Sequence, residues 1–317
     1  MGRHPRTRFA ARRCLRLLIS GALLVTLSFL MLHLVPGDPV RDALGAKAPA
    51  SLVEAKRHEL GLDQPLLRQY GEYWAGLVQG DLGRSIATSD PVGTTIAERF
   101  PATLALAGLA FLLVIVLAFP IGLLMAALTH GGRRRSAELA FTGTTGLLNT
   151  VPDFVLGTAL VASFAVGLGA FPVAGQDGPS SYVLPVIALG LGGAATLARV
   201  VRVESLKVLD EDYLRTARSK RLPAWRIHLV HTLPNAVTGS LTVGGLVLCG
   251  LVGGTVLVEN VFAWPGVGST IVQAVLTKDY PLVQGIVLVL GGAVLLINTV
   301  VDVALMLLDP RSELHAA

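Results

Sequence analysis

Few residues in this chain have the type and spacing that catalysis or metal binding needs. His228 and His231 lie three residues apart on a predicted helix, a spacing that can hold a metal ion, but no Cys or third His stands near them. We therefore interpret the pair as polar surface histidines. No lysine follows a glycine, so the phosphate-binding loop of nucleotide hydrolases is missing, and no Gly-x-Ser-x-Gly turn is present. We predict no catalytic residue, no metal site, no bound cofactor and no ATP hydrolysis by this chain itself.

A second set of candidates consists of polar side chains inside apolar stretches. Asp153 follows Pro152, Glu259 lies near the end of one stretch, and Asp302 follows Asn298 by one helical turn. Such groups are costly in a membrane and usually face the protein interior or a water-filled path. Each either fastens helices together or contacts a transported substrate. The position of Asp302 near the end of its stretch favours fastening, whereas Asp153 and Glu259 stay open between the two roles.

The composition indicates a polytopic all-α membrane protein. The chain has 317 residues, of which 52% are hydrophobic and only 15% charged, and its mean hydropathy is +0.65. A soluble domain carries about 25% charged residues. The net charge of +5 suits a nucleic-acid-binding protein, but this hydropathy does not, and two cysteines exclude a disulfide scaffold.

Six stretches approach the roughly 20 apolar residues that a transmembrane helix needs. They are Leu15–Val35, Pro101–Leu128, Leu139–Leu168, Leu184–Ala198, Asn235–Val258 and Leu282–Leu308. Pro152 and Asp153 interrupt the third stretch, and the fourth is short. The first stretch is too long for a signal peptide and has no small-x-small cleavage site, so we expect an uncleaved anchor. Gly190-Leu191-Gly192-Gly193 in the fourth favours close helix packing.

The distribution of Lys and Arg predicts the orientation. Most of the 26 basic residues lie at the N-terminus, at 133–135 and within 199–226. By the positive-inside rule these regions and both termini are cytoplasmic. The expected organisation is a basic terminus and first anchor at 1–35, an external helical segment at 36–100, and a five-helix transport domain at 101–317 with a cytoplasmic loop at 202–234. The net charge is then a topology signal and requires no acidic partner.

The sequence of the external segment predicts two helices. Ser51 and Glu54 have the spacing of a capping box, and Gly61 suits the end of that helix. A second helix is expected from Pro65 to Gly80. Its apolar residues fall on one face: Leu66, Leu67, Tyr70, Trp74, Leu77 and Val78. This face either packs on the membrane surface or a neighbouring subunit, which the stripe alone favours, or contacts an external partner.

The cytoplasmic loop 202–234 is the most charged part of the chain. Residues 211–220 place acidic side chains first and basic ones last, which matches the dipole of a helix. Pro223 interrupts the pattern, and a second short helix is expected from Trp225 to Leu233, before Pro234. The loop is either an ordinary solvated connection or a docking element for a cytoplasmic protein, and its composition does not decide between them.

Several motifs in order make the chain similar to a known family. It resembles the B-type membrane subunit of dipeptide and oligopeptide ABC importers, a family that includes nickel permeases. The motifs are Leu34-Val35-Pro36-Gly37-Asp38-Pro39, Leu60-Gly61-Leu62-Asp63-Gln64-Pro65, Gly80-Asp81-Leu82-Gly83-Arg84-Ser85, residues 259–268, Asp279-Tyr280-Pro281 and Leu308-Asp309-Pro310-Arg311. The resemblance runs nearly end to end and implies the six-helix architecture of a type I ABC importer permease.

The loop also resembles the ATPase-coupling motif of this family, through residues 212–220 and 231–235. The resemblance implies that a short helix seats in a groove of a nucleotide-binding subunit. The implied coupling residues are Glu211, Asp212, Tyr213, Arg215, Thr216, Ala217, Arg218, Lys220, Arg221 and Leu222. Arg221 departs from the motif, which has Gly there. If the turn needs a positive φ, Arg is costly where Gly is not.

The resemblance further implies a set of partners. The chain would form half of a translocation path in a bacterial plasma (inner) membrane, with a second homologous permease subunit, two cytoplasmic ATPase subunits or domains that bind ATP and Mg, and an external substrate-binding protein. Nucleic acid has no place in this assembly. The pathway or gate candidates are Asp153, Glu259, Trp264, Asn298 and Asp302.

Three other functions stay open. A nickel or metal-chelate permease is the alternative within the family, although the chain has no His-rich or Met-rich lining. An ion-driven secondary transporter predicts inverted repeats and charges at the midplane, and neither is evident. A structural or assembly protein of the membrane leaves the coupling sequence unexplained.

Overall fold

The computed structural model describes residues 5–34, 38–45 and 47–308, and within these ranges the chain is helical. Outside the helices, the described residues hold one isolated antiparallel bridge, between Arg84 and Pro91. The all-α prediction is thereby confirmed. Three expected features lie outside the description: the basic side chains up to Arg12, the centre of the Leu34–Pro39 motif, and Asp309-Pro310-Arg311.

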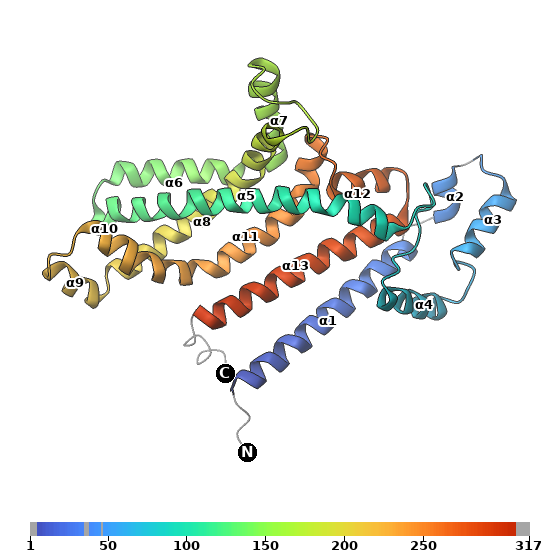
Figure 1. The fold of residues 1–317 in the computed structure, drawn as a ribbon, viewed down its shortest axis with the longest axis horizontal. Helices are drawn as coiled ribbons and strands as arrows, with labels where there is room; N and C mark the ends of the chain where they lie inside the picture. Colours follow the sequence, from blue (N-terminus) through green and yellow to red (C-terminus); the bar gives the residue numbers. More distant parts are fainter. Residues whose placement is uncertain (1–4, 35–37, 46, 309–317) are drawn as a thin grey trace. The chain divides into compact units, whose positions relative to one another are not determined.

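Five helices are long and apolar enough to cross a membrane, and a bent pair brings the number to six if it is one span. The five are α1 (Pro5–Leu34), α5 (Val92–Thr129), α8 (Val183–Leu209), α11 (Leu233–Val261) and α13 (Tyr280–Leu308) (Figure 1). The short fourth stretch thus belongs to a much longer helix, α8.

The bent pair comprises α6 (Arg135–Thr150) and α7 (Asp153–Leu160), with α7 continuing into a π-helical turn, η2 (Val161–Gly167). The two parts meet at 94°, where the sequence predicted an interruption. Val151 is extended, with φ −78° and ψ 119°, as expected for a residue that precedes proline.

The chain divides into two compact units, which are described separately. The second unit holds residues 104–264 and the end of α13 from Ile297. Here α8 packs against α6, α7 and α11. A Cβ atom at Gly190 would lie 3.1 Å from the Ala110 carbonyl oxygen of α5, and one at Gly193 would lie 2.8 Å from Val247 Cγ1 of α11. The expected role of these glycines in close packing is confirmed.

The first unit holds the residues up to Thr103 and residues 265–296. Its apolar core joins the start of α5, α12 (Val267–Leu276) and the first part of α13: Val92, Ile96, Val267, Ala274, Leu282, Val283 and Ile286. A buried polar pair joins α13 to α1, because Gln284 Nε2 donates to the Ser28 carbonyl at 2.9 Å. This pairing satisfies an amide inside an apolar region, where an unpaired one is costly.

Segment 36–100 begins with three helices, α2 (Pro39–Leu44), α3 (Ala50–Glu59) and α4 (Leu66–Gln79). The expected capping box of Ser51 and Glu54 is wrong. Pro49 precedes the helix and Ala50 starts it, so Ser51 already has helical backbone and cannot cap. Gly61 does end this helix, with φ +65°.

The expected helix from Pro65 to Gly80 is confirmed to within one residue, and Gly80 closes it with φ +80°. Its buried face differs from the expected stripe. Tyr70 and Tyr73 pack on Phe29 of α1, with ring centroids 5.2 and 5.7 Å apart, whereas Leu67 is 87% exposed. Aromatic contacts with α1 therefore decide the rotation of α4, and Leu66, Leu67 and Val78 stay exposed.

Two motifs that lie far apart in sequence meet through Asp279. Its carboxylate accepts hydrogen bonds from the Ser85 hydroxyl and from the Ile86 backbone N–H, the latter at 3.0 Å. The Ser85 hydroxyl in turn accepts from the Thr88 N–H at 2.9 Å. Asp279 and Ser85 are each 1% exposed. A buried carboxylate with two donors fastens the 81–88 loop to the turn before α13.

Replacing Asp279 is expected to destabilise this unit. Asp279→Ala leaves two buried donors without an acceptor, which costs about 2–4 kcal/mol. Thermal unfolding of the purified protein and proteolysis of segment 36–100 measure the change. The exposed carboxylate of Glu54 provides the matched control, and Glu54→Ala should change the stability by less than about 0.5 kcal/mol. Equal effects of the two substitutions would contradict a fastening role for Asp279.

Candidate functional site

The predicted coupling segment forms a compact structure, which we call the α9 loop (residues 210–223). It leaves the end of α8 and contains the helix α9 (Asp212–Ser219). Leu214 and Ala217 lie one turn apart and are 0% and 8% exposed. They pack in a small core with Leu209 of α8, Ala126 of α5 and Ile227. One apolar face of α9 is therefore fixed to the membrane helices of its own unit.

The end of α9 has the hydrogen bonds of a Schellman motif. Leu222 N–H donates to the Ala217 carbonyl at 3.3 Å, and Arg221 N–H donates to the Arg218 carbonyl at 2.9 Å. Arg221 has φ +55°, the left-handed conformation that this motif requires. Leu222 packs against the same small core as Ala217. The turn therefore does need a positive φ at the position where the resemblance expects Gly, and Arg adopts it.

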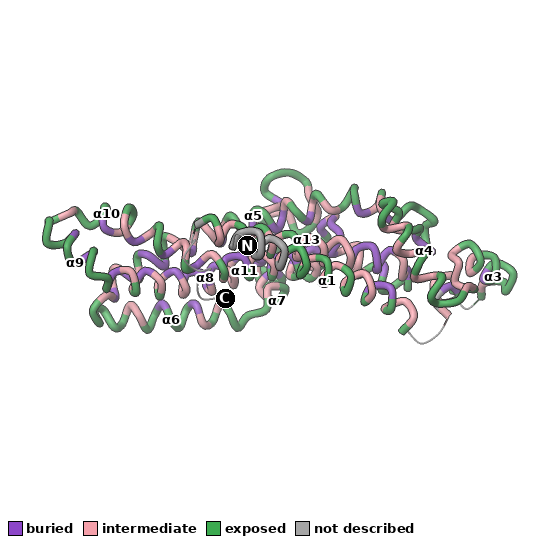
Figure 2. The backbone as a smooth tube through the Cα atoms, turned by 90° about the horizontal axis from the view of Figure 1, so that it is seen from below, coloured by how far each residue is buried: buried purple, intermediate pink, exposed green. Residues whose placement is uncertain are grey.

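The other face of α9 is exposed, as its polar sequence predicts. Figure 2 shows exposed and buried positions alternating along α9. Of the ten implied coupling residues, Ala217 is buried and Leu222 half-buried. The exposed ones are Glu211, Asp212, Tyr213, Arg215, Thr216, Arg218, Lys220 and Arg221. Burial and the neighbouring Glu211 raise the pKa of Tyr213 above its ordinary value.

Hydrogen bonds hold the α9 loop at several points. Arg218 donates to the Leu209 carbonyl at 3.0 Å, and Asn235 Nδ2 donates to the Tyr213 hydroxyl at 3.2 Å and to the His231 carbonyl at 2.8 Å. The two halves of the expected motif, 212–220 and 231–235, therefore meet in space. A loop fixed at both ends of its helix moves as a body with the helices that carry it.

The second expected helix of the loop is not separate. α10 (Ala224–Arg226) runs into a π-helical turn, η4 (Ile227–Thr232), and then directly into α11. The predicted break before Pro234 is wrong, because η4 and α11 form one continuous helical run, Ala224–Val261, with Pro234 in its interior, just after the π-helical turn.

His228 and His231 are half-buried in η4. Within the described ranges, no three His, Cys, Asp or Glu side chains are grouped in a way that could hold a metal ion.

The pathway candidate Asp153 lies at the break between α6 and α7, against α8 and α11. A Cβ at Gly192 would lie 3.4 Å from one Asp153 carboxylate oxygen, and a Cβ at Gly254 would lie 3.4 Å from the other. Asp153 is half-buried. The two glycines give the carboxylate room between three helices.

Glu259 and Trp264 lie together at the turn after α11. Both are 0% exposed, and the Trp264 N–H donates to the Glu259 carbonyl at 2.8 Å. The Trp264 ring meets the Tyr182 ring edge-on, with centroids 4.6 Å apart. Tyr182 ends the short 3-10 helix η3 (Pro179–Tyr182), so the indole fastens two loops of the second unit.

Asn298 and Asp302 lie on the end of α13 that belongs to the second unit. The Cys249 thiol donates to Asn298 Oδ1 at 3.5 Å, and Asp302 is half-buried. The five pathway candidates therefore lie at three separate places in the second unit.

Sequence reasoning missed a cluster of polar side chains beside Asp153, formed by Asn149, Thr196 and Arg199. The signal available was the spacing of Gly192, Thr196 and Arg199 along one helix face.

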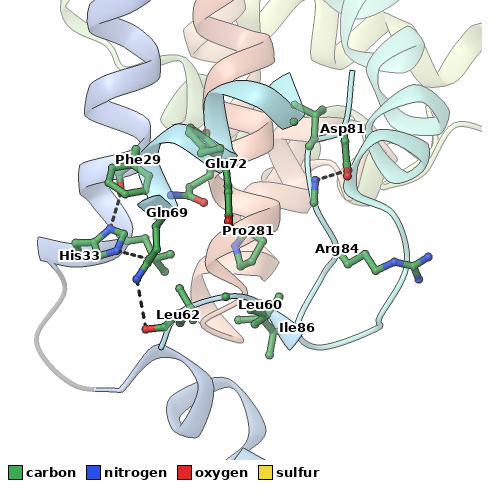
Figure 3. A pocket seen from close by; sticks show the side chains of 17 residues that line it. Phe29, His33, Leu60, Leu62, Gln69, Glu72, Asp81, Arg84, Ile86 and Pro281 are labelled. Carbon is green, nitrogen blue, oxygen red and sulfur yellow. Dashed lines mark hydrogen bonds between the residues drawn. The ribbon is translucent and has the colours of Figure 1, made fainter. Parts of the chain in front are cut away.

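The first unit contains a cavity of about 210 Å³ between α1, α4, the 81–86 loop and the start of α13. Figure 3 shows His33 and Gln69 at its wall. His33 Nε2 and Gln69 Oε1 are hydrogen-bonded at 3.0 Å, and Gln69 Nε2 also donates to the Gln64 carbonyl at 2.7 Å. These bonds join α1 to the α3–α4 connection.

The chain matches two models of known protein families. Residues 118–313 match the family described as "Binding-protein-dependent transport system inner membrane component", and residues 6–107 match the N-terminal family of the same membrane components. The first match includes the bent pair, the α9 loop and α11.

Full-length relatives carry transport names. A putative peptide transport system permease of Brucella suis is 41% identical over 90% of this chain and 92% of its own length. The glutathione transport system permease GsiC of Escherichia coli is 38% identical over 95% and 97%.

A solved structure supports the fold. An inward-facing MetNI methionine ABC transporter chain matches with a TM-score of 0.57, covering 70% of this chain and all of its own, at 21% identity. The chain accordingly belongs to the inner-membrane components of binding-protein-dependent transport systems, and is a non-catalytic permease subunit of an ABC importer.

Proposed function

We propose that this permease imports short peptides. The observation that carries this proposal is the near full-length similarity to a peptide permease and to a glutathione permease, glutathione being itself a tripeptide. ABC importer permeases work with a substrate-binding protein and with ATPase partners. The cargo enters from the binding protein, and this chain supplies part of the path.

The α9 loop is the contact with the ATPases. Its buried face is built into the membrane helices and its outer face presents a tyrosine and several charges, which suits a separate protein with a polar groove. ATP and Mg bind to those partners. Closure of two ATPases moves the α9 loop as a body, and the movement reaches the transport path through α8 and α11.

The same proposal extends to the partner subunits, the orientation in the membrane and the residues of the transport path. A second homologous permease subunit completes the path and two ATPase subunits or domains drive it. The protein is multi-pass in the bacterial inner membrane, with both termini and the α9 loop in the cytoplasm and segment 36–100 outside, because most basic residues then lie inside. Asp153, Glu259, Trp264, Asn298 and Asp302 are proposed to line or shape the path.

Transport by the assembled complex tests the coupling role. Proteoliposomes with the partner permease, ATPases and binding protein should take up labelled trialanine only with hydrolysable ATP. Tyr213→Ala and Arg215→Ala each remove an exposed interface anchor, worth about 2 kcal/mol or more, and should lower uptake and ATPase co-purification by about 30-fold.

Arg68 of α4 is the matched control for these variants, since it is exposed but lies in segment 36–100. Arg68→Ala should leave ATPase co-purification within about twofold of wild type. Full uptake by the α9 variants would contradict coupling through this loop. Uptake that persists without ATP and collapses with an ion gradient would favour a secondary transporter.

The left-handed conformation of Arg221 gives a prediction about the loop itself. Arg221→Gly should stabilise the α9 loop by about 1 kcal/mol, because Gly reaches positive φ without strain. Hydrogen exchange of the 212–222 amides should slow accordingly. Ser219→Gly is the matched control in the last helical turn, where Gly should instead cost about 0.5 kcal/mol and speed exchange. Faster exchange in both variants would show that the positive φ carries no cost.

A further inference from the structure

A polar cluster, formed by the side chains of Asn149, Thr196 and Arg199, lies in the middle of the second unit. It lies on the face shared by the end of α6, the start of α7 and α8. Thr196 Oγ1 and the Asn149 side chain are 2.8 Å apart. In the amide orientation that satisfies both of its ends, Asn149 donates to the Gly192 carbonyl at 2.9 Å and accepts from the Arg199 guanidinium. Asn149 thus joins α6 to the centre of α8.

The Asp153 carboxylate and the Arg199 guanidinium carry formal charges beside this polar cluster. Neither charge is balanced by an opposite charge among the described residues. Among the residues that the structure describes, the Asp153 carboxylate has no ion pair or hydrogen-bond donor, and the Arg199 side chain has no ion pair but hydrogen-bonds to the neutral Asn149 amide. Both side chains are half-buried, and Asn149 is exposed. Charged groups in membrane helices avoid lipid and face the protein interior or water. This face of the subunit is therefore expected to meet protein or water and not lipid.

The residues around the two charges lie along one face of α8. Gly192, where a Cβ would lie 3.4 Å from an Asp153 carboxylate oxygen, precedes Thr196 by four residues and Arg199 by seven, so all three lie on one face. Arg199 reaches back along this face to Asn149, because helical side chains are tilted toward the helix N-terminus.

We propose that Asp153 and Arg199 form a transient binding site for zwitterionic peptides in the transport path, which rests on the peptide import proposed above. Asp153 receives the N-terminal ammonium group and Arg199 the C-terminal carboxylate, while Asn149 and Thr196 meet the backbone between them. Gly192 and Gly254 keep the Asp153 carboxylate open, since neither carries a Cβ over it. The site recognises peptide ends and ignores side chains.

Uptake by proteoliposomes of the complete transporter tests this site, with labelled trialanine and its C-terminal amide as probes. Arg199→Gln removes one charge-assisted hydrogen bond and should lower trialanine uptake at least about tenfold, but amide uptake less than about twofold. Arg199→Lys should keep trialanine uptake within about threefold. Asp153→Asn should lower the uptake of both peptides at least about tenfold, since both carry the ammonium group.

Arg133 provides the matched control, because it is an exposed guanidinium in the turn before α6. Arg133→Gln should leave uptake of both peptides within about twofold of wild type. For each peptide, uptake by the variant is divided by uptake by wild type. The binding protein is the same in both measurements, so its preference for one peptide cancels in this ratio. Equal loss of both peptides in Arg199→Gln, or no loss in either charge variant, would overturn the site. Absence of uptake by wild type would instead overturn the proposed function.

A second measurement covers variants that fail to assemble or a wild type that does not take up the amide. In a Cys14→Ser, Cys249→Ser background, Thr196→Cys is labelled with a charged thiol reagent during ATP turnover. Trialanine should slow this labelling at least about threefold at saturation. Unchanged labelling in the presence of transported trialanine would overturn the site.

Discussion

Helix α8 approaches its neighbours so closely that glycine is needed on both sides of the contact. A Cβ at Gly122 of α5 would lie 2.7 Å from the Ala198 carbonyl oxygen of α8, and one at Gly190 of α8 would lie 3.1 Å from the Ala110 carbonyl of α5. In a lipid environment, where burial of apolar surface does not drive association, such backbone proximity is the main source of helix packing. The rest of the second unit is arranged around this axis.

The functional elements follow from the position of α8. Its N-terminal half adjoins the break that carries Asp153, its middle carries Thr196 and Arg199, and its end supplies Leu209 to the core under α9. A rigid helix of 27 residues thus connects the loop that we propose to meet the ATPases with the face that we propose to meet the peptide. Transmission needs no flexible relay, because a rigid helix carries movement along its length.

Polar groups in this chain divide into two kinds by their partners. Gln284 with Ser28, and Asp279 with Ser85 and Ile86, are buried and satisfied, and so serve stability. Asp153 and Arg199 lack opposite charges among the described residues and lie on a partly open face. An unbalanced charge in a membrane helix is costly unless it faces water or the protein interior, which is the physical reason to propose a role in transport for these two.

The sequence by itself predicted the apolar segments that are long enough to cross a membrane, because length and hydropathy require no knowledge of contacts, and it located the break at Pro152 because proline lacks the N–H that a helix needs. It also placed α4 between Pro65 and Gly80 and identified the α9 motif. Tertiary structure alone decided which face of α4 is buried, since Tyr70 and Tyr73 find Phe29 of α1. It likewise decided the meeting of Ser85 with Asp279, the left-handed turn at Arg221, and the group around Asn149. These depend on contacts between residues remote in the chain, or on packing that selects one backbone conformation, and local sequence patterns give only a partial signal for them.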